Sequence, residues 1–392
     1  MKVLIIGGTG TLSSPIVDEC IRRGYEVAMI NRGKRNRFIN PEAELIKCDI
    51  NNEEALKDIV KDRMFDCCID FLVFNELQLQ KSLRIFTESC HTKQYIFISS
   101  AQVYNTSNEG IKEEDTSELI QPLWSYSINK VKCENLLKEY CNKKKINYTI
   151  IRPGVTYGDT RIPYGMDPKR GKHWTMIERI KAGKPIITWN KGKNRLNLTH
   201  VNDFTIGAVG LIGNKMAYNE AFNVVGDYVY TWKEVLETIG KIINQNVKTI
   251  DIPVDFYASE LSEYVCGRLK GGRAQDLCCS NKKLKSVVPE FKTTITLEEG
   301  IKKTIDFYRK NDFCDGFDYA WDAECDRFIS DYCSKTYLPK KNIRYVQYNK
   351  CSIRESISLK FDYYIEFYKG SSKGWLLKKL RKLIKTVLRK IQ

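Results

Sequence analysis

The sequence predicts an α/β protein with a doubly wound parallel sheet, a smaller mixed α/β lobe and a basic, helical C-terminal tail. Three observations predict this fold class. Short apolar runs alternate with longer amphipathic segments over roughly the first 155 residues. The apolar runs lack the alternation of a half-exposed strand, which indicates strands buried on both faces of a sheet. A glycine-rich segment directly follows the first run, as at the first strand–helix turn of doubly wound folds.

The elements of the first half follow from apolar periodicity and from the turn residues between the runs. Because helices separate successive strands, the strands are expected to run parallel, with helices on both faces of the sheet. Strands are expected at residues 2–8, 26–32, 43–50, 65–71, 94–100 and 148–154. Helices are expected at residues 12–24, 53–62, 76–90 and 126–142.

The regular alternation ends at Gly158. Residues 158–185 are rich in Gly, Pro, Lys and Arg and are expected to form loops around one helix. A strand near 221–226 and helices near 231–244 and 296–311 follow. The predicted parts are a sheet domain at 1–157, a lobe at 158–335 with elements returning to that domain, and a tail at 336–392.

Charge is concentrated at the C-terminal end of the chain. The net charge is +16, and the residues from Thr336 onward carry 15 Lys/Arg and 3 Asp/Glu, or +12. The other 335 residues therefore carry about +4, which argues against a basic nucleic-acid groove on the main domain. No apolar run is long enough to cross a bilayer, and the N-terminus lacks the apolar core of a signal peptide.

The 14 cysteines are scattered along the chain and include adjacent pairs at Cys67-Cys68 and Cys278-Cys279. This pattern indicates free thiols in a reducing, cytoplasmic setting rather than a disulfide framework. The sequence has no C-x-x-C motif and only three histidines, so no metal site is expected.

The glycine-rich segment Gly7–Ser13 links the first strand to the first helix. Its glycines allow a tight turn, and the free N–H groups of the helix N-terminus attract a pyrophosphate. The contacts expected for a Rossmann-like dinucleotide site are Gly7, Gly10, Thr11 and Leu12. An ordinary glycine-rich turn is the alternative, but the position between strand and helix favours the cofactor site.

The second strand ends in Asn31-Arg32, where NAD-binding proteins usually place an acidic residue against the ribose hydroxyls. A cation at this point suits a 2′-phosphate, so NADP is favoured over NAD. The alternative interpretation is a solvated charge run.

Tyr126 and Lys130 form a Tyr-x-x-x-Lys motif, which places both side chains on one helix face. The lysine cation can lower the pKa of the tyrosine from its ordinary value of about 10, which makes a usable base. The motif recurs at Tyr140/Lys144 and Tyr337/Lys341. Only Tyr126 lies on the helix after a strand that ends in hydroxyl residues, Ser99-Ser100, so Tyr126 is the candidate base.

Together these residues resemble the extended short-chain dehydrogenase/reductase superfamily, with its NAD(P)-dependent nucleotide-sugar epimerases, dehydratases and reductases. The resemblance covers about residues 1–312. The matching segments are Asp49-Ile50, Ser99–Tyr104, Arg152–Gly158, Thr199–Asp203 and Leu297–Ile301.

The resemblance implies hydride transfer at a sugar carbon of a nucleotide sugar, as in a 4-epimerase or a ketosugar reductase of surface-glycan biosynthesis. It implies that Tyr126 is the base, that Lys130 holds the ribose, and that Ser100 hydrogen-bonds the reacting oxygen. The cofactor contacts that it implies further are Asp49, Ile50, Phe71, Lys130 and Pro153.

Two departures from the family pattern bear on the reaction. Dehydratases carry an Asp-Glu pair where this chain has Ala101 and Gln102, which argues against dehydration. Many epimerases place a phosphate-binding arginine where this chain has Leu196, with Arg195 one step away.

The segment 374–392 predicts an amphipathic helix with one apolar stripe and many lysines and arginines. Such a helix suits an anionic membrane surface, which would place the protein peripherally on the cytoplasmic face. The alternative is a helix packed on this protein or across a homodimer. Two other function classes stay open: an atypical relative that binds RNA, and a scaffold that holds cofactor without turnover.

Overall fold

The structure is a computed structural model that describes residues 1–34, 39–106, 110–119, 124–168, 171–311, 316–339 and 343–390. In the last helix, side chains are described as far as residue 384. The chain forms two compact units that interleave along the sequence. The first comprises Met1–Gly158, Asn194–Thr231 and Ser262–Gly300, and the second comprises Asp159–Lys193, Trp232–Leu261 and Ile301–Gln392.

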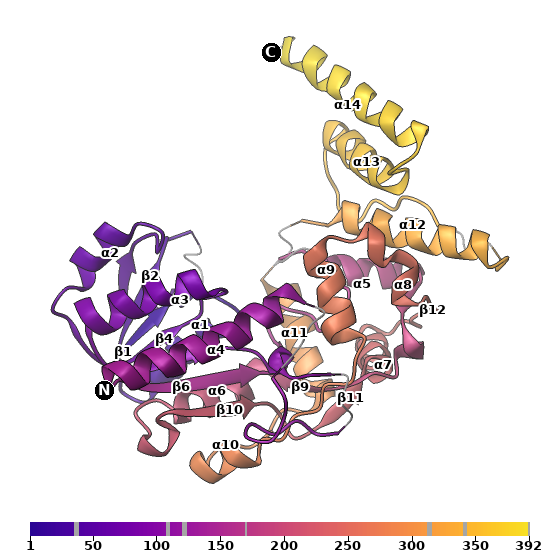
Figure 1. Cartoon of the computed structure of the whole chain (residues 1–392). Coiled ribbons are helices and arrows are strands. Elements are labelled where there is room, and N and C mark those ends of the chain that lie inside the picture. The colour runs from indigo at the N-terminus through magenta and orange to yellow at the C-terminus, as the bar shows by residue number, and fades with distance from the viewer. Residues whose placement is uncertain are drawn as a thin grey trace. The chain divides into compact units, whose positions relative to one another are not determined.

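A seven-stranded sheet, parallel throughout, forms the centre of the first unit (Figure 1). The strand order is β10-β6-β5-β4-β1-β2-β3, so the winding direction reverses between β1 and β4. This arrangement confirms the predicted doubly wound, Rossmann-like fold. The strands are β1 (Lys2–Ile6), β2 (Glu26–Asn31), β3 (Glu44–Lys47), β4 (Met64–Asp70), β5 (His91–Ile98), β6 (Asn147–Pro153) and β10 (Glu220–Val224).

Helices cover both faces of this sheet, which explains why its strands are apolar without alternation. In β1, Val3 and Ile5 face one core, while Leu4 and Ile6 face the other. The first core is closed by α1 (Ser13–Arg22) and α6 (Val201–Gly210). The second is closed by α2 (Glu53–Val60), α3 (Glu76–Leu83) and α4 (Ser125–Lys144).

The rest of the first unit contains a small sheet and short helices. The sheet has the order β11-β9-β7, with β11 antiparallel and β7 parallel to β9. Its strands are β7 (Val155–Tyr157), β9 (Arg195–His200) and β11 (Val229–Thr231). The described helices of this part are α9 (Glu263–Arg268) and α10 (Lys282–Val287).

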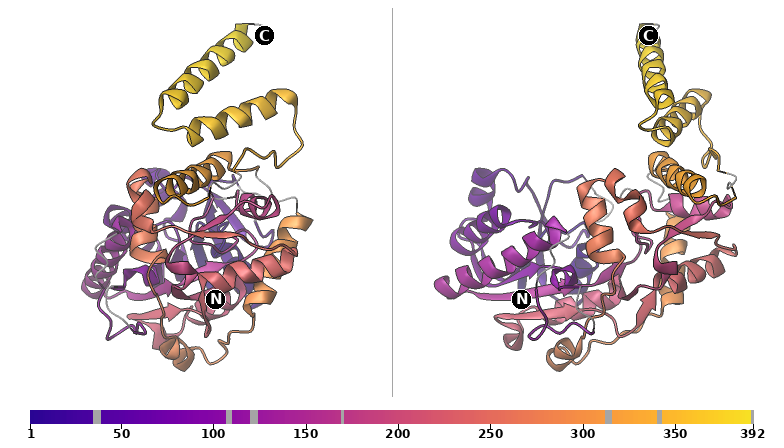
Figure 2. Two further views of the ribbon diagram at one scale, coloured as in Figure 1. Left: turned by 90° about the vertical axis from the view of Figure 1, so that its right-hand side faces the viewer. Right: turned by 45° about the vertical axis from the view of Figure 1, so that its right-hand side comes forward.

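The second unit is mainly helical, with a two-stranded parallel sheet of β8 (Ile186–Thr188) and β12 (Thr249–Asp251). Its C-terminal helices α12, α13 and α14 pack in series, and α13 and α14 form a V-shaped pair (Figure 2). The helices are α5 (Trp174–Lys181), α7 (Trp232–Ile243), α8 (Val254–Tyr257), α11 (Leu297–Lys310, which begins in the first unit), α12 (Tyr319–Lys335), α13 (Ile353–Phe367) and α14 (Ser372–Lys390).

Several elements differ from the periodicity-based expectation, including the following two. The helix expected at 76–90 is α3 followed by a π-helical turn, Arg84–Ser89. Residues 340–370, which carried no predicted element, contain α13, begun by a capping box between Ser352 and Glu355. The predicted 374–392 helix corresponds to α14, except that residues 391–392 lie outside the described part of the chain. The three-part domain assignment stays a prediction.

Among the described helices, none combines the length and the apolarity that a membrane span requires. The cysteines that the structure describes are all free.

Candidate active site

The turn after β1 is closed by Ser13. The Gly10 N–H donates to the Ser13 Oγ at 2.8 Å, and this hydroxyl donates to the Gly7 carbonyl oxygen at 2.7 Å. Gly7 has a φ of +85°, and a Cβ there would lie 2.8 Å from Leu72 Cγ. Only glycine fits this position. The turn lies at the carboxyl end of β1, beside the point where the strand order reverses, which is where doubly wound sheets bind ligands.

Asn31, Arg32 and Asp49 lie near one another at the ends of β2 and β3. The Thr9 hydroxyl donates to Asn31 Oδ1 at 3.5 Å, and the buried Asn31 Nδ2 has no hydrogen-bond partner among the described residues. The Asn51 backbone N–H lowers the pKa of Asp49, and the charge of Arg32 lowers this pKa further. Arg32 is exposed, so its guanidinium is accessible to a ligand.

Asp70, at the end of β4, is a buried site residue that the sequence reasoning missed. Its carboxylate accepts hydrogen bonds from Ser82, from the Tyr95 hydroxyl at 3.0 Å and from the Leu72 N–H at 2.8 Å. Burial raises the pKa of Asp70. These bonds shape the segment after β4, whose Leu72 side chain lies against Gly7. An acidic residue at the end of an apolar strand was the signal in the sequence.

Lys130 joins α4 to the ends of two strands. Its buried Nζ donates to the carbonyl oxygens of Val73, at 2.6 Å, and Ile98, at 2.7 Å. The same Nζ lies 5.7 Å from the ring centroid of Tyr126, so the structure brings the two motif residues together. Burial lowers the pKa of Lys130 to about 8.

Ser100 follows β5 and begins a short 3₁₀ turn, Ala101–Val103. Its Oγ accepts a hydrogen bond from the Gln102 N–H at 3.2 Å. Because Ile98 is the last residue of β5, its bond with Lys130 links α4 to the strand end that carries Ser100. Tyr126 is half-buried against Trp124, with ring centroids 4.7 Å apart.

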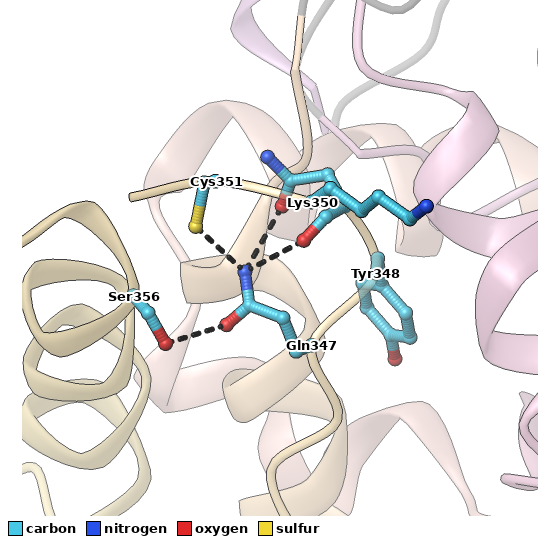
Figure 3. A pocket seen from close by; sticks show the side chains of 6 residues that line it. Gln347, Tyr348, Lys350, Cys351 and Ser356 are labelled. Atoms are coloured by element: carbon cyan, nitrogen blue, oxygen red, sulfur yellow. Dashed lines mark hydrogen bonds between the residues drawn. The ribbon is translucent and has the colours of Figure 1, made fainter. Parts of the chain in front are cut away.

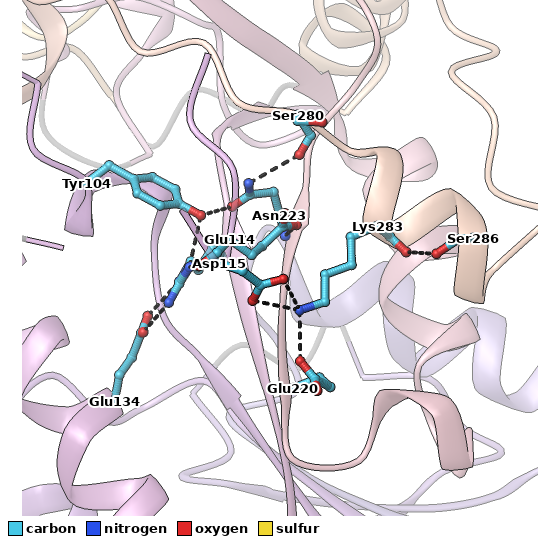
Figure 4. Close-up of polar contacts among 10 residues, drawn as sticks. Tyr104, Glu114, Asp115, Glu134, Glu220, Asn223, Ser280, Lys283 and Ser286 are labelled. Carbon is cyan, nitrogen blue, oxygen red and sulfur yellow. Dashed lines mark hydrogen bonds and ion pairs between the residues drawn. The ribbon is translucent and has the colours of Figure 1, made fainter. Parts of the chain in front are cut away.

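A buried polar network that includes Glu134 connects α4 to β6 and β10 (Figure 4). Glu134, one turn after Lys130 on α4, accepts hydrogen bonds from the Ser99 hydroxyl at 2.6 Å and from Arg152 Nε and Nη2 at 3.0 and 2.6 Å. The side chains of Glu134 and Arg152 are 0% and 1% exposed. The network therefore ties α4 to β6 and to the residue before Ser100.

The network continues toward β10. Arg152 Nη1 donates to the Tyr104 hydroxyl at 2.9 Å, and this hydroxyl donates to Asn223 Oδ1 at 2.8 Å. The Asn223 N–H donates to Glu114 at 2.7 Å, and burial raises the pKa of this carboxyl. The segments matched in the sequence contain Arg152 and its partner Tyr104, but neither Glu134 nor Asn223 was predicted as a member of the site.

The other two Tyr-x-x-x-Lys pairs have different surroundings. Tyr140 and Lys144 both contact Glu88, at 2.8 and 2.9 Å. Tyr337 is 95% exposed, and Lys341 lies outside the described residues. The catalytic and cofactor roles of the predicted residues stay predictions.

The structure shows the surroundings of Gln102 and Leu196, two residues at which the sequence departs from the family pattern. Gln102 Oε1 would lie 2.5 Å from a Cβ at Gly272, so this side chain packs directly on the chain at Gly272. Leu196 is buried, whereas Arg195 is bound to Asp276 at 2.8 Å. Among the described residues, no group of three or more His, Cys, Asp or Glu could hold a metal ion.

Comparison with known proteins finds relatives that are named as sugar-nucleotide enzymes and one that is named as a stem-loop binding protein. The curated relatives include a putative UDP-glucose 4-epimerase from Methanocaldococcus jannaschii, 24% identical over 334 residues, covering 79% of this chain and 99% of the relative. They also include the chloroplast stem-loop binding protein of 41 kDa b from Arabidopsis thaliana, 26% identical over 271 residues, covering 64% and 67%.

Solved structures share the fold. The UDP-glucuronic acid 4-epimerase from Bacillus cereus, in complex with UDP-glucuronic acid and NAD, has a TM-score of 0.63 and 18% identity. The match covers 79% of this chain and 100% of that chain. The model of the NAD dependent epimerase/dehydratase family matches residues 3–224, more than half of the sequence. The chain belongs to the NAD dependent epimerase/dehydratase family.

Proposed function

We propose that this protein is an NAD(P)-dependent enzyme that transfers hydride at a sugar carbon of a nucleotide sugar, as a 4-epimerase or a ketosugar reductase. The observation that carries the proposal is that Tyr126 lies beside the buried amine of Lys130. Both residues are on α4, and the Lys130 amine is hydrogen-bonded near the carboxyl ends of β4 and β5. Family membership and the nucleotide-sugar relatives support this substrate class.

The residues present fit a dinucleotide. The glycine turn lies at the start of α1, where backbone N–H groups would face a pyrophosphate, and the buried Asn31 Nδ2 is a donor for a ribose oxygen. Contacts along the cofactor are proposed for Thr11, Leu12 and Phe71. The remaining proposed contacts are Gly7, Gly10, Arg32, Asp49, Ile50, Lys130 and Pro153. When bound, the nicotinamide would accept the hydride or donate it.

Proton transfer is assigned to the chain's own residues. Tyr126 removes the proton from the sugar hydroxyl, and the nearby Lys130 cation stabilises its phenolate form. The Ser100 hydroxyl hydrogen-bonds the oxygen of the reacting carbon. Return of hydride to the opposite face of the carbon, with the proton returned from Tyr126, would give epimerisation. A ketosugar reductase would run only the second half: the keto carbon would receive hydride from a reduced nicotinamide, and Tyr126 would donate the proton to its oxygen.

Dehydration is disfavoured by the side chains after Ser100. Ala101 has no proton to transfer, and the Gln102 amide lies against Gly272. Neither residue can supply the acid–base pair that elimination of water needs.

Incubation with UDP-glucose and UDP-glucuronic acid, with NAD or NADP, tests the proposal when ring protons are followed by NMR. We expect a new sugar epimer in this incubation, or oxidation of added NADPH when a 4-keto nucleotide sugar is supplied instead, with turnover lowered about 10²–10⁴-fold in Tyr126→Phe. Tyr140→Phe is the matched control on the same helix and should keep full turnover. Full turnover in Tyr126→Phe would overturn the mechanism.

NADP is proposed as the preferred cofactor because Arg32 is exposed at the end of β2 and its charge reaches Asp49. Arg32→Ala should weaken NADP binding and leave NAD binding little changed in calorimetric titrations. A preference for NAD that is indifferent to Arg32→Ala would contradict this assignment.

RNA binding is a second candidate function, because one relative is described as a stem-loop binding protein. The nearly neutral main body counts against it. A steep fall of RNA affinity with salt, in protein that turns over no nucleotide sugar, would favour it. Retained cofactor without any turnover would instead indicate a scaffold.

We further place the enzyme in the cytoplasm, in surface-glycan biosynthesis and at the cytoplasmic face of a membrane through residues 374–392. The alternative is that this segment forms the interface of a homodimer.

A further inference from the structure

About a fifth of this chain lies outside the fold that it shares with one solved structure. The Bacillus cereus epimerase is covered in full by a match that spans only 79% of this chain. The last 22 residues, 371–392, contain eight lysines and arginines and no acidic residue. A segment with such a one-sided charge favours binding to a partner of opposite charge.

Helix α14 exposes a stripe of large apolar side chains. Trp375, Leu376, Leu380, Leu383 and Ile384 are 60%, 52%, 41%, 62% and 40% exposed. The leucine positions 376, 380 and 383 are spaced so that they share one face of the helix. Exposed apolar side chains gathered on one face mark an interaction surface.

The opposite side of α14 is held by α13, and this contact determines which face is exposed. Leu377 is half-buried, and Arg381, one turn later, forms an ion pair with Asp362 of α13. Lys378, Lys379 and Lys382 are exposed beside the apolar stripe. The surface thus combines an apolar stripe with a basic flank.

Helix α13 is in turn held to the rest of the second unit at a buried charge cluster. Arg179 Nη1 lies 2.7 Å from carboxylate oxygens of Asp322 and Asp326, and Lys184 Nζ lies 2.6 Å from both side chains. The Tyr363 hydroxyl of α13 donates to Asp326 at 2.6 Å.

The loop before α13 also forms hydrogen bonds, around a pocket that residues 347–351 line together with Ser356 (Figure 3). Gln347 Nε2 donates to Cys351 Sγ and to Asn349 Oδ1, each at 3.2 Å, and Gln347 Oε1 accepts from Ser356 of α13 at 3.2 Å. The orientation of the exposed face of α14 is therefore determined by its contact with α13, which is itself bonded to α12.

We propose that the exposed stripe of α14 and its flanking lysines bind the surface of an anionic lipid bilayer. The stripe enters the boundary of the acyl chains, and the lysines contact the phosphates. A second copy of the chain fits less well, because pairing two α14 faces would bring like charges together without a compensating acid. This proposal does not depend on the catalytic one.

Co-sedimentation with vesicles tests the proposal on the full-length protein. We expect binding to vesicles of phosphatidylcholine with phosphatidylglycerol, weak binding to phosphatidylcholine alone, and a loss of binding at high salt. The triple variant Lys378→Gln/Lys379→Gln/Lys382→Gln should bind about a hundredfold less tightly. The reason is that each cation near an anionic surface strengthens binding by a factor of about five. Its matched control is Lys61→Gln/Lys143→Gln/Lys302→Gln, three exposed lysines outside this segment, which should bind like the wild type.

The apolar stripe is tested by Leu376→Glu/Leu383→Glu, which should abolish vesicle binding. Its control is Ile111→Glu/Met216→Glu, because these side chains are similarly exposed, at 67% and 66%. Equal binding by stripe variant and control would overturn the proposal. So would a wild-type dimer in light scattering that the stripe variant converts to monomer, since the stripe would then be a subunit interface.

Discussion

Replacement of Glu134 by glutamine isolates the contribution of the buried ion pair behind the candidate active site. The substitution keeps the shape of the side chain and one acceptor oxygen, but removes the charge that Arg152 contacts through two nitrogens. Both side chains are at most 1% exposed, so water cannot replace the lost charge. Arg152 is then left as a buried cation without a counter-ion.

Removal of one partner from a buried pair typically costs about 3–5 kcal/mol, because the remaining charge stays desolvated. A glutamine oxygen in the place of Glu134 Oε1 still accepts two of the three hydrogen bonds, from Ser99 and Arg152 Nε, so the lower end of this range is expected here. At about 2–4 °C per kcal/mol for a unit of this size, the melting temperature should fall by roughly 6–12 °C.

Differential scanning calorimetry at pH 7 measures this shift. Glu139→Gln is the matched control, since Glu139 is exposed on the same helix, and it should change the melting temperature by less than about 1–2 °C. The double variant Glu134→Leu/Arg152→Met removes both charges and should recover much of the loss. A melting temperature of Glu134→Gln within the range of the control would refute the reasoning.

Three further predictions concern other parts of the chain. Because burial lowers the pKa of Lys130 to about 8, kcat/KM should fall above pH 8 as this cation is lost, and Lys130→Arg should move that limb to higher pH. In the unfolded chain Lys130 keeps its proton to about pH 10. Between pH 8 and 10 the free energy of unfolding of the wild type should therefore rise with pH relative to that of Lys130→Met. If the difference between the two free energies does not change with pH, the assignment is contradicted. Gly10→Val should abolish cofactor binding in titration calorimetry while the protein stays folded, and unchanged affinity would exclude this turn as the site. Deletion of 374–392 should leave the melting temperature nearly unchanged, whereas deletion of 344–392 should lower it markedly by uncovering the buried charge cluster; equal effects would show that α14 is itself structural.

Much of the first unit could be predicted because its signals are local. The strand β1 is apolar at four successive positions, and burial on both faces of a parallel sheet demands this pattern. The Tyr126/Lys130 pair was also readable, because positions four apart share a helix face. Element ends were less accurate, since the turn at Arg84–Ser89 becomes π-helical without a clear sequence mark.

The partners of the buried polar groups could not be predicted. The two oxygens that bind Lys130 belong to Val73 and Ile98, and backbone carbonyls carry no sequence signature. Glu134 and Arg152 were each visible as charged residues, but only their burial shows that they form a pair.

The sequence by itself determined the doubly wound sheet, the glycine turn, the proximity of Tyr126 to Lys130 and the amphipathic character of the last helix. Each depends on periodicity or spacing within a few residues, where backbone geometry alone sets which side chains are neighbours. The tertiary structure alone decided how charges distant in sequence combine, as when Arg179 meets Asp322 across 143 positions. It also decided which face of α14 is exposed, because that face depends on where α13 packs. Such contacts arise from the packing of whole elements, which the order of residues along one element does not specify.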